Sequence, residues 1–342
     1  MKRLIPLVVA TGALLGAAPA ASAAVDLSGG ETRLTLAKGT AKALTSLGVR
    51  VAPTGPATAR GRHVRFPISG GAIDPATAAG TIRHRGGLRL SAGRTRVVLS
   101  NYVVRVGGRI TLSAKIGNGR AKILNLTGSP RVTRSGFGTD VRGLTARLNR
   151  TAARTLNRVF GVKAFEAGLP LGKVVVRAQP SQAELLARGD TALALDAGTL
   201  GALIGLGVTP NVIGPATLEG TTARFPITGG KAQLDFSAGT ISHSGGISLT
   251  AGATQVNLTD FDIVIGQSVR LFATVTGAAA KVPIADLSLG NPPQVSGRAI
   301  TVAGVTVRLS AEAAAALNTA FGTTALAAGL PLGTATVTAT GK

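Results

Sequence analysis

Residues 80–106 read GTIRHRGGLRLSAGRTRVVLSNYVVRV, and residues 239–265 read GTISHSGGISLTAGATQVNLTDFDIVI. In both stretches apolar residues alternate with polar ones, and glycine-containing turns separate the runs. This pattern is typical of β-strands that place one face in a core and are joined by tight turns. The two stretches match at a constant spacing of 159 residues, so the chain contains two copies of one β-rich unit.

The duplication extends over most of the chain. Near the end of each copy the spacing grows to 161 residues, which indicates a small insertion in the second copy. A short polar stretch with a proline, residues 178–181, separates the copies. We therefore predict two domains, residues 24–179 and 181–342. The further matched segments are RFPISGG (65–71) with RFPITGG (224–230), and AGLPLG (167–172) with AGLPLG (328–333).

Within the long strand of each copy the apolar residues change parity. Val97 and Leu99 lie on one face of an ideal strand, whereas Tyr102 and Val104 lie on the other. The change falls at residues 100–101, and the second copy repeats it at 259–260. A β-bulge at this point would place both sets on the core face.

Helices are expected near both ends of each copy. The first should end at Gly48 or Gly207, and the second should begin after a cap residue, Asn149 or Ser310. The sequence therefore predicts a mainly β fold with two tandem antiparallel β-sandwich or barrel domains. Each domain should carry two or three short helices.

The N-terminus has the layout of a secretory signal peptide. Lys2 and Arg3 precede an apolar run over residues 4–17, and Ala-Ser-Ala at 21–23 offers a cleavage site near Ala23. An N-terminal anchor helix is the alternative. No later stretch is long and apolar enough to predict a transmembrane segment in the mature chain, so we expect a secreted or extracytoplasmic protein. The chain has no cysteine, which excludes disulfides, thiolate catalysis and cysteine-bound metals.

Positive charge is concentrated in the first copy. Residues 24–180 carry 27 Lys or Arg against 5 Asp or Glu, a net charge of +22, whereas residues 181–342 carry 8 against 9, a net charge of −1. Eight arginines in two groups have neutral counterparts in the second copy, so the fold does not require their charge. We interpret them either as a solvated face or as a surface that binds polyanions. The strand group is Arg83, Arg85, Arg89, Arg94 and Arg96, and the helix group is Arg150, Arg154 and Arg158.

His84 and His243 are the matched histidines. Each lies two residues after an isoleucine on a predicted strand, so it should point toward the apolar side. The sequence leaves two interpretations: a ligand-binding histidine in a pocket, or a structural histidine bonded to a turn carbonyl. Tyr102 is the one tyrosine, and Phe261 replaces it in the second copy, which favours core packing over a role of its hydroxyl.

The sequence offers little for catalysis. A duplicated acid–base site should show matched carboxylates near the histidines, yet only Glu31 has a clear acidic counterpart, Asp190. Known hydrolase, metalloprotease and phosphate-loop motifs are absent from the sequence. We therefore predict that the protein is not an enzyme, and a hydrolase is the weakest of the hypotheses.

The run Gly-Thr-Ile-x-His-x-Gly-Gly, followed by a long alternating strand, resembles the HtaA-type domains. These are secreted or surface-attached actinobacterial modules associated with haem uptake. The resemblance implies a β-sandwich that binds haem through a tyrosine assisted by a histidine, with His84 and His243 at the histidine position. The family's tyrosine lies in an N-terminal segment, and residues 24–50 and 183–209 contain no tyrosine or tryptophan. Haem is the candidate cofactor that the resemblance implies, and the matched tyrosine ligand is missing from this sequence.

Together these patterns predict a secreted, non-catalytic, HtaA-like tandem binding protein of the cell surface or envelope. The alternative is an envelope structural protein whose basic first copy binds an anionic polymer or a membrane surface. Few aromatic residues lie among the arginines, so sequence-specific binding of nucleic acid is not expected.

Overall fold

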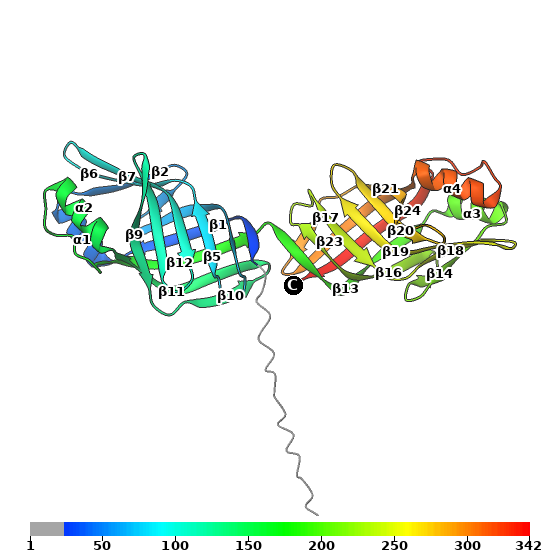
Figure 1. Cartoon of the computed structure of the whole chain (residues 1–342), viewed down its shortest axis with the longest axis horizontal. Helices are drawn as coiled ribbons and strands as arrows, with labels where there is room; N and C mark the ends of the chain where they lie inside the picture. The colour runs from blue at the N-terminus through cyan, green and yellow to red at the C-terminus, as the bar shows by residue number, and fades with distance from the viewer. Residues whose placement is uncertain (1–23) are drawn as a thin grey trace, which may run out of the picture.

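The computed structural model describes residues 24–342 and contains two antiparallel sheets of 12 strands, one per copy (Figure 1). The predicted signal peptide lies outside the described residues. The first sheet contains β1 (Val25–Leu36), β2 (Arg50–Thr54), β3 (Thr58–Arg60), β4 (His63–Ile73), β5 (Gly80–His84), β6 (Gly87–Ala92), β7 (Thr95–Val106), β8 (Ile110–Ile116), β9 (Gly119–Thr127), β10 (Arg131–Ser135), β11 (Gly138–Leu148) and β12 (Pro170–Pro180). The second contains β13 (Gln182–Leu195), β14 (Thr209–Ile213), β15 (Thr217–Glu219), β16 (Thr222–Gln233), β17 (Gly239–His243), β18 (Gly246–Ala251), β19 (Thr254–Ile265), β20 (Val269–Val275), β21 (Val282–Leu289), β22 (Gln294–Ser296), β23 (Ala299–Leu309) and β24 (Pro331–Gly341).

Eight strands of each sheet close into a barrel. In the first copy the order around the barrel is β7-β5-β4-β1-β12-β11-β9-β8, and β8 pairs again with β7. The second copy repeats this order, and its closing pair is β19 with β20. Of the two architectures that the sequence left open, the barrel is the one formed. Closure gives every wall strand two neighbours and so removes the free sheet edges.

The predicted bulge is confirmed. It divides β7 into two segments that pair with different strands. Residues 95–100 of β7 pair with β6, whereas residues 103–106 pair with β5. Between these segments Asn101 has a φ of 47°, and Asp260 in the second copy has a φ of 52°. Because of the bulge, Leu99 and Tyr102 both face the barrel interior.

The matched glycine pairs are required by close packing of the backbone. A Cβ atom at Gly87 would overlap the carbonyl of Leu99 on the neighbouring strand, and one at Gly246 would overlap the carbonyl of Leu258. Only glycine allows this approach without moving the strand.

Each barrel carries two helices, the lower of the two numbers predicted. The side chain of Asn149 accepts a hydrogen bond from the backbone N–H of Ala152 (2.7 Å), and Ser310 accepts one from Ala313 (3.1 Å). Both predicted caps are therefore confirmed. The helices are α1 (Lys38–Ser46) and α2 (Arg150–Phe160) in the first copy, and α3 (Ala197–Gly205) and α4 (Ala311–Phe321) in the second.

The two barrels lie end to end, with the helices at the two far ends of the molecule (Figure 1). Only Ser181 separates β12 from β13, and its backbone N–H donates to the carbonyl of Asp26 (2.7 Å). No helix among residues 24–342 combines the length and the apolar character needed to cross a membrane.

Candidate functional site

The second barrel encloses a cavity of about 360 Å³. Leucine, isoleucine and valine side chains form most of its wall. Ile204 at the end of α3 and Leu218 in β15 both line the cavity and are 61% and 47% exposed, so the cavity wall reaches the surface at these two residues. An apolar cavity with an apolar mouth suits a small apolar molecule.

The first barrel has a smaller cavity of about 270 Å³, also with an apolar wall. The counterparts of Ile204 and Leu218 are Thr45 and Ala59, and neither lines this cavity. Instead, the exposed Val159 of α2 lies at its edge. The two copies therefore share a barrel and differ in the chemistry of its mouth.

A histidine–threonine pair is buried at the same place in each barrel. His84 Nε2 lies 2.7 Å from Thr32 Oγ1, and His84 Nδ1 lies 3.2 Å from the carbonyl oxygen of Tyr102. His243 repeats this arrangement with Thr191 (2.7 Å) and with the carbonyl of Phe261 (3.1 Å). The carbonyl can only accept, so Nδ1–H donates to it and Nε2 accepts from the threonine hydroxyl.

This arrangement holds both histidines neutral. Burial lowers the pKa of His84 from 6.5 to about 4, although the bond to the Tyr102 carbonyl opposes the shift. Burial likewise lowers the pKa of His243. The histidines join β5 to β1, and β17 to β13, at the bulge of the long strand. The geometry contains the carbonyl bond of the structural interpretation, and His243 also lines the cavity of the second barrel.

Tyr102 packs in the core, as its exchange with phenylalanine predicted. Its ring meets Phe66 edge to face, with centroids 4.9 Å apart, and Phe261 meets Phe225 in the same way at 5.0 Å. Burial raises the pKa of the Tyr102 phenol above its ordinary value. Tyr102 is also part of the wall of the first cavity.

The residues of the two cavities do not fit an iron-ligated haem. Proteins hold haem iron through histidine, tyrosine, cysteine or methionine. In the second cavity His243 is the one wall residue of these types, and both its ring nitrogens are already bonded. In the first cavity it is Tyr102, whose raised pKa disfavours the phenolate that would bind iron. Among residues 24–342 there is also no group of three histidine or acidic side chains that could hold a metal ion.

All eight arginines predicted as a surface are exposed, and none forms an ion pair within the described part of the chain. The register of β6 and β7 places Arg89 and Arg96 on the same outer face. Arg50 of β2 lies opposite Ser91 and belongs to the same face, although no sequence pattern predicted this position. Its position depends on the pairing of β2 with β6, which is not local in the sequence.

The strand group and the helix group lie on different elements. Arg150, Arg154 and Arg158 follow the exposed side of α2, which packs against β9. Three further exposed basic residues lie on β8 and β9. They are Lys115, Arg120 and Lys122.

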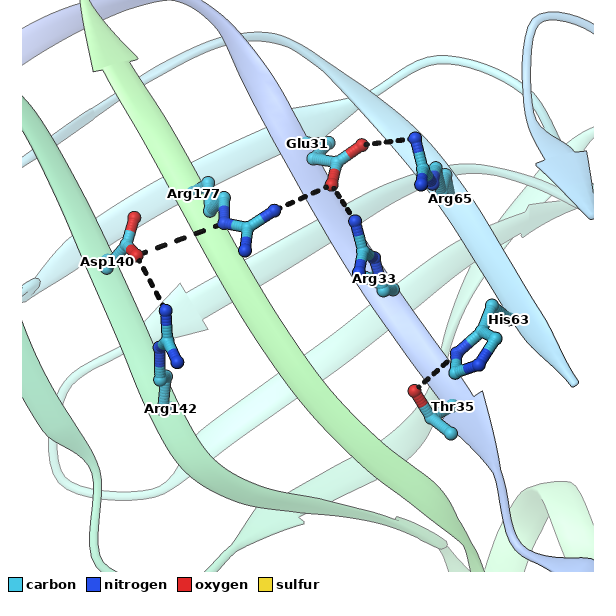
Figure 2. A network of polar contacts seen from close by, with 8 residues as sticks. All are labelled: Glu31, Arg33, Thr35, His63, Arg65, Asp140, Arg142 and Arg177. Carbon is cyan, nitrogen blue, oxygen red and sulfur yellow. Dashed lines mark hydrogen bonds and ion pairs between the residues drawn. The ribbon is translucent and has the colours of Figure 1, made fainter.

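A polar network covers the outer face of strands β4, β1, β12 and β11 (Figure 2). Glu31 contacts Arg33 (3.0 Å), Arg177 (3.4 Å) and Arg65 (3.8 Å). Arg177 also contacts Asp140 (3.9 Å), which pairs with Arg142 (3.3 Å). Two carboxylates thus face four arginines, so the network keeps a positive charge. In the sequence, only the match of Glu31 with Asp190 pointed to this face.

His63, drawn beside the network, is exposed, and its Nδ1 lies 3.0 Å from Thr35 Oγ1 (Figure 2). It is a surface residue, as expected from its unmatched position.

A scan against protein-family models and a search of curated proteins give no match. Among solved structures, the chain is similar to the C-terminal domain of HtaA from Corynebacterium glutamicum, with 13% identity and a TM-score of 0.37 over 45% of this chain and 98% of that domain. The N-terminal domain of HtaA matches with 14% identity and a TM-score of 0.34, over 46% and 99% of the two chains. The haem-binding protein HtaB of the same organism matches with 12% identity and a TM-score of 0.33, over 47% and 95%. Two of these three structures are domains of HtaA, the protein after which the family resembled by the sequence is called.

Proposed function

We propose that this protein is an exported, non-catalytic binding protein that holds an apolar small molecule inside its barrels, mainly in the second. The observation that carries the proposal is the cavity of about 360 Å³ with an apolar wall and an exposed apolar mouth at Ile204 and Leu218. Contact between water and exposed apolar side chains at a cavity entrance is unfavourable. A ligand that covers these side chains removes them from water, and this makes the free energy of binding more favourable.

The polar residues of the barrels support a non-catalytic role. A general base must be free to take a proton from a substrate, yet each buried histidine uses one nitrogen as donor and the other as acceptor within the protein. With a pKa of about 4, His84 stays neutral at neutral pH. The histidines and threonines join neighbouring strands, and the cavity wall presents mainly apolar side chains to a ligand.

The experiment is a titration of the mature protein with 1-anilinonaphthalene-8-sulfonate, followed by displacement with fatty acids of increasing chain length. We expect saturable binding with a stoichiometry of one high-affinity site. Leu203→Trp should abolish this site, because the larger ring would occupy the cavity from α3. Leu44→Trp, the matching change in the first barrel, is the control and should leave the site intact.

Non-saturable binding, or equal effects of the two tryptophan variants, would contradict the proposal. Haem is titrated in parallel, and we expect weak or no uptake because neither cavity offers a free iron ligand. A stoichiometric Soret band would show that haem is a ligand. Loss of that band in His84→Ala or His243→Ala would identify the residue responsible.

A second function is favoured by a different observation. The eight exposed arginines of the first copy have no acidic partners within residues 24–342, which leaves their charge available to an anionic envelope polymer or membrane surface. Cavity binding and surface binding use separate parts of the protein, so both can operate together.

A further inference from the structure

The turn between β10 and β11 of the first copy reaches into the second barrel. Phe137 lies at the tip of this turn, where an exposed residue is expected, yet it is only 6% exposed. Its ring belongs to the hydrophobic core of the second copy, which also contains buried residues from the starts of β13 and β23 and the end of β24. These include Ala183, Leu185, Ile300 and Ala339.

Further contacts close to Phe137 join the first copy to the second. Arg134 Nη2 donates a hydrogen bond to the carbonyl of Lys342 (2.9 Å). A Cβ atom at Gly136 would lie 2.8 Å from the carbonyl of Gly297, and one at Gly341 would overlap the Phe137 ring. The packing is therefore tight enough that it leaves no room for a single methyl group at Gly341.

The two turns that meet here are equivalent in the duplicated sequence. Gly136 and Gly297 are 161 residues apart, the spacing of the second half of each copy. The barrels thus meet at equivalent turns. The symmetry breaks at the next residue, because the counterpart of Phe137 is Arg298, which is exposed.

Because of this difference, the core of the second copy includes a residue of the first, whereas the core of the first copy includes no residue of the second. Every buried residue of the first hydrophobic core lies between Leu27 and Ala178, so this core includes no residue of the second copy. The core of the second barrel includes Phe137. Ile263, Val305 and Val337 belong to that core and also line the ligand cavity, so Phe137 packs into the cluster beneath the cavity floor.

We infer that Phe137 is an anchor through which the first copy completes the core of the second and fixes the two barrels as one rigid body. The inference goes beyond ligand binding and does not depend on it. It assigns a tertiary role to a turn residue whose own barrel does not need it.

The test follows each barrel separately in the full chain. Fluorescence of Tyr102, the single tyrosine, reports the first barrel, and amide hydrogen exchange resolved by peptide reports the second. Phe137→Ala should lower the unfolding midpoint of the second barrel by roughly 10 °C, because it removes a buried aromatic ring. It should leave the midpoint of the first barrel unchanged. Leu289→Ala, which shortens an exposed apolar side chain of the second barrel, is the control and should have little effect.

A double substitution separates docking from a general loss of stability. Gly341→Ala alone should destabilise the second barrel, because its methyl group overlaps the Phe137 ring. Combined with Phe137→Ala, it should cost much less than the sum of the two single effects, since the methyl group then occupies space that the ring has left. Small-angle scattering should show one extended particle for the natural chain and a distribution of inter-barrel angles for Phe137→Ala. Additive effects, or hydrogen exchange of the second barrel unchanged by Phe137→Ala, would overturn the inference.

Discussion

At the scale of single residues, the same histidine–threonine contact occurs twice although the surrounding charges differ. Thr32 with His84 and Thr191 with His243 are both separated by 2.7 Å, in a basic and in a near-neutral domain. The contact ties the strand that opens each copy to the strand before the glycine pair. A buried imidazole satisfied at both nitrogens costs little in desolvation, and it specifies one strand arrangement.

The first prediction concerns the pH dependence of this contact. The pKa of His84 is lowered in the folded protein, so the unfolded chain binds more protons below pH 6.5 and stability must fall as pH decreases toward 4. Between pH 7.5 and pH 5 we expect the first barrel to lose about 2 kcal/mol through this residue. Urea unfolding followed by Tyr102 fluorescence measures the loss. His84→Gln should be less stable at pH 7.5 and should lack most of the pH dependence; an unchanged pH dependence would mean that another group titrates.

The second prediction concerns the one tyrosine. Tyr102→Phe creates the aromatic pair that the second copy already has in Phe225 and Phe261, so thermal unfolding followed by circular dichroism should change by less than about 1 kcal/mol. Probe binding to the cavities should also be unchanged. A loss above about 2 kcal/mol, or altered probe binding, would assign a role to the hydroxyl.

At the scale of elements, α2 and α4 pack against their barrels in the same way but expose different side chains to solvent. Both helices have 11 residues, begin with a side-chain cap, and end at a glycine with positive φ, Gly161 and Gly322. Their buried faces begin at equivalent alanines, Ala152 and Ala313. The exposed face carries three arginines in α2 and only alanine or threonine at the same positions in α4. Charge therefore varies independently of the fold.

The third prediction uses this independence. Replacing Arg150, Arg154 and Arg158 with alanine should flatten the salt dependence of heparin binding by up to ~3 in log–log slope, if all three contact anionic groups. Helix stability should hardly change, because alanine has the highest helix propensity and is the residue at two of these positions in α4. Heparin affinity measured over a range of salt concentrations gives the slope. An unchanged slope would assign the charge of α2 to solubility.

Elements could be predicted from the sequence where local pattern determines them. The change of parity at residues 100–101 predicted the bulge, and Asn149 and Ser310 predicted the starts of two helices, because bulges and caps depend on a few neighbouring residues. The barrel could not be distinguished from a sandwich, since closure depends on the pairing of β7 with β8 in addition to β5. The first half of β1, which begins at Val25, could not be predicted either, because it contains glycine and serine instead of an alternating pattern.

The candidate site was predicted less well, for a related reason. The burial of His84 and the packing of Tyr102 followed from alternation and from comparison of the two copies. The cavity walls draw on strands and helices from the whole of each copy, and Phe137 acts across the domain boundary. Such features depend on contacts between residues far apart in the sequence, and an alternating pattern contains no information about them.

At the scale of the whole molecule, two barrels with the same topology are joined at matching ends and differ in charge, in cavity size and in the chemistry of their mouths. The net charge of +22 lies in residues 24–180, whereas the larger cavity lies in the near-neutral second barrel. Because α1 and α2 lie at one end of the molecule and α3 and α4 at the other (Figure 1), a surface bound near the helices of the first copy would leave the helices of the second copy accessible. This division is the one that the proposed function requires, in which the first copy binds an anionic surface and the second holds the ligand.

The last prediction tests this division with the separate copies. Fragments 24–179 and 181–342 should each fold, because each contains a complete set of 12 strands and two helices. Fragment 24–179 should keep the stability that the first barrel has in the full chain and should bind heparin at low salt. Fragment 181–342 lacks Phe137, so it should unfold at a lower temperature than the same barrel in the full chain, and it should not bind heparin. Circular dichroism and a heparin column measure both properties. Equal retention of the two fragments would contradict the assignment of polyanion binding to the first copy, and an unfolded fragment in either case would show that the copies are not independent folding units.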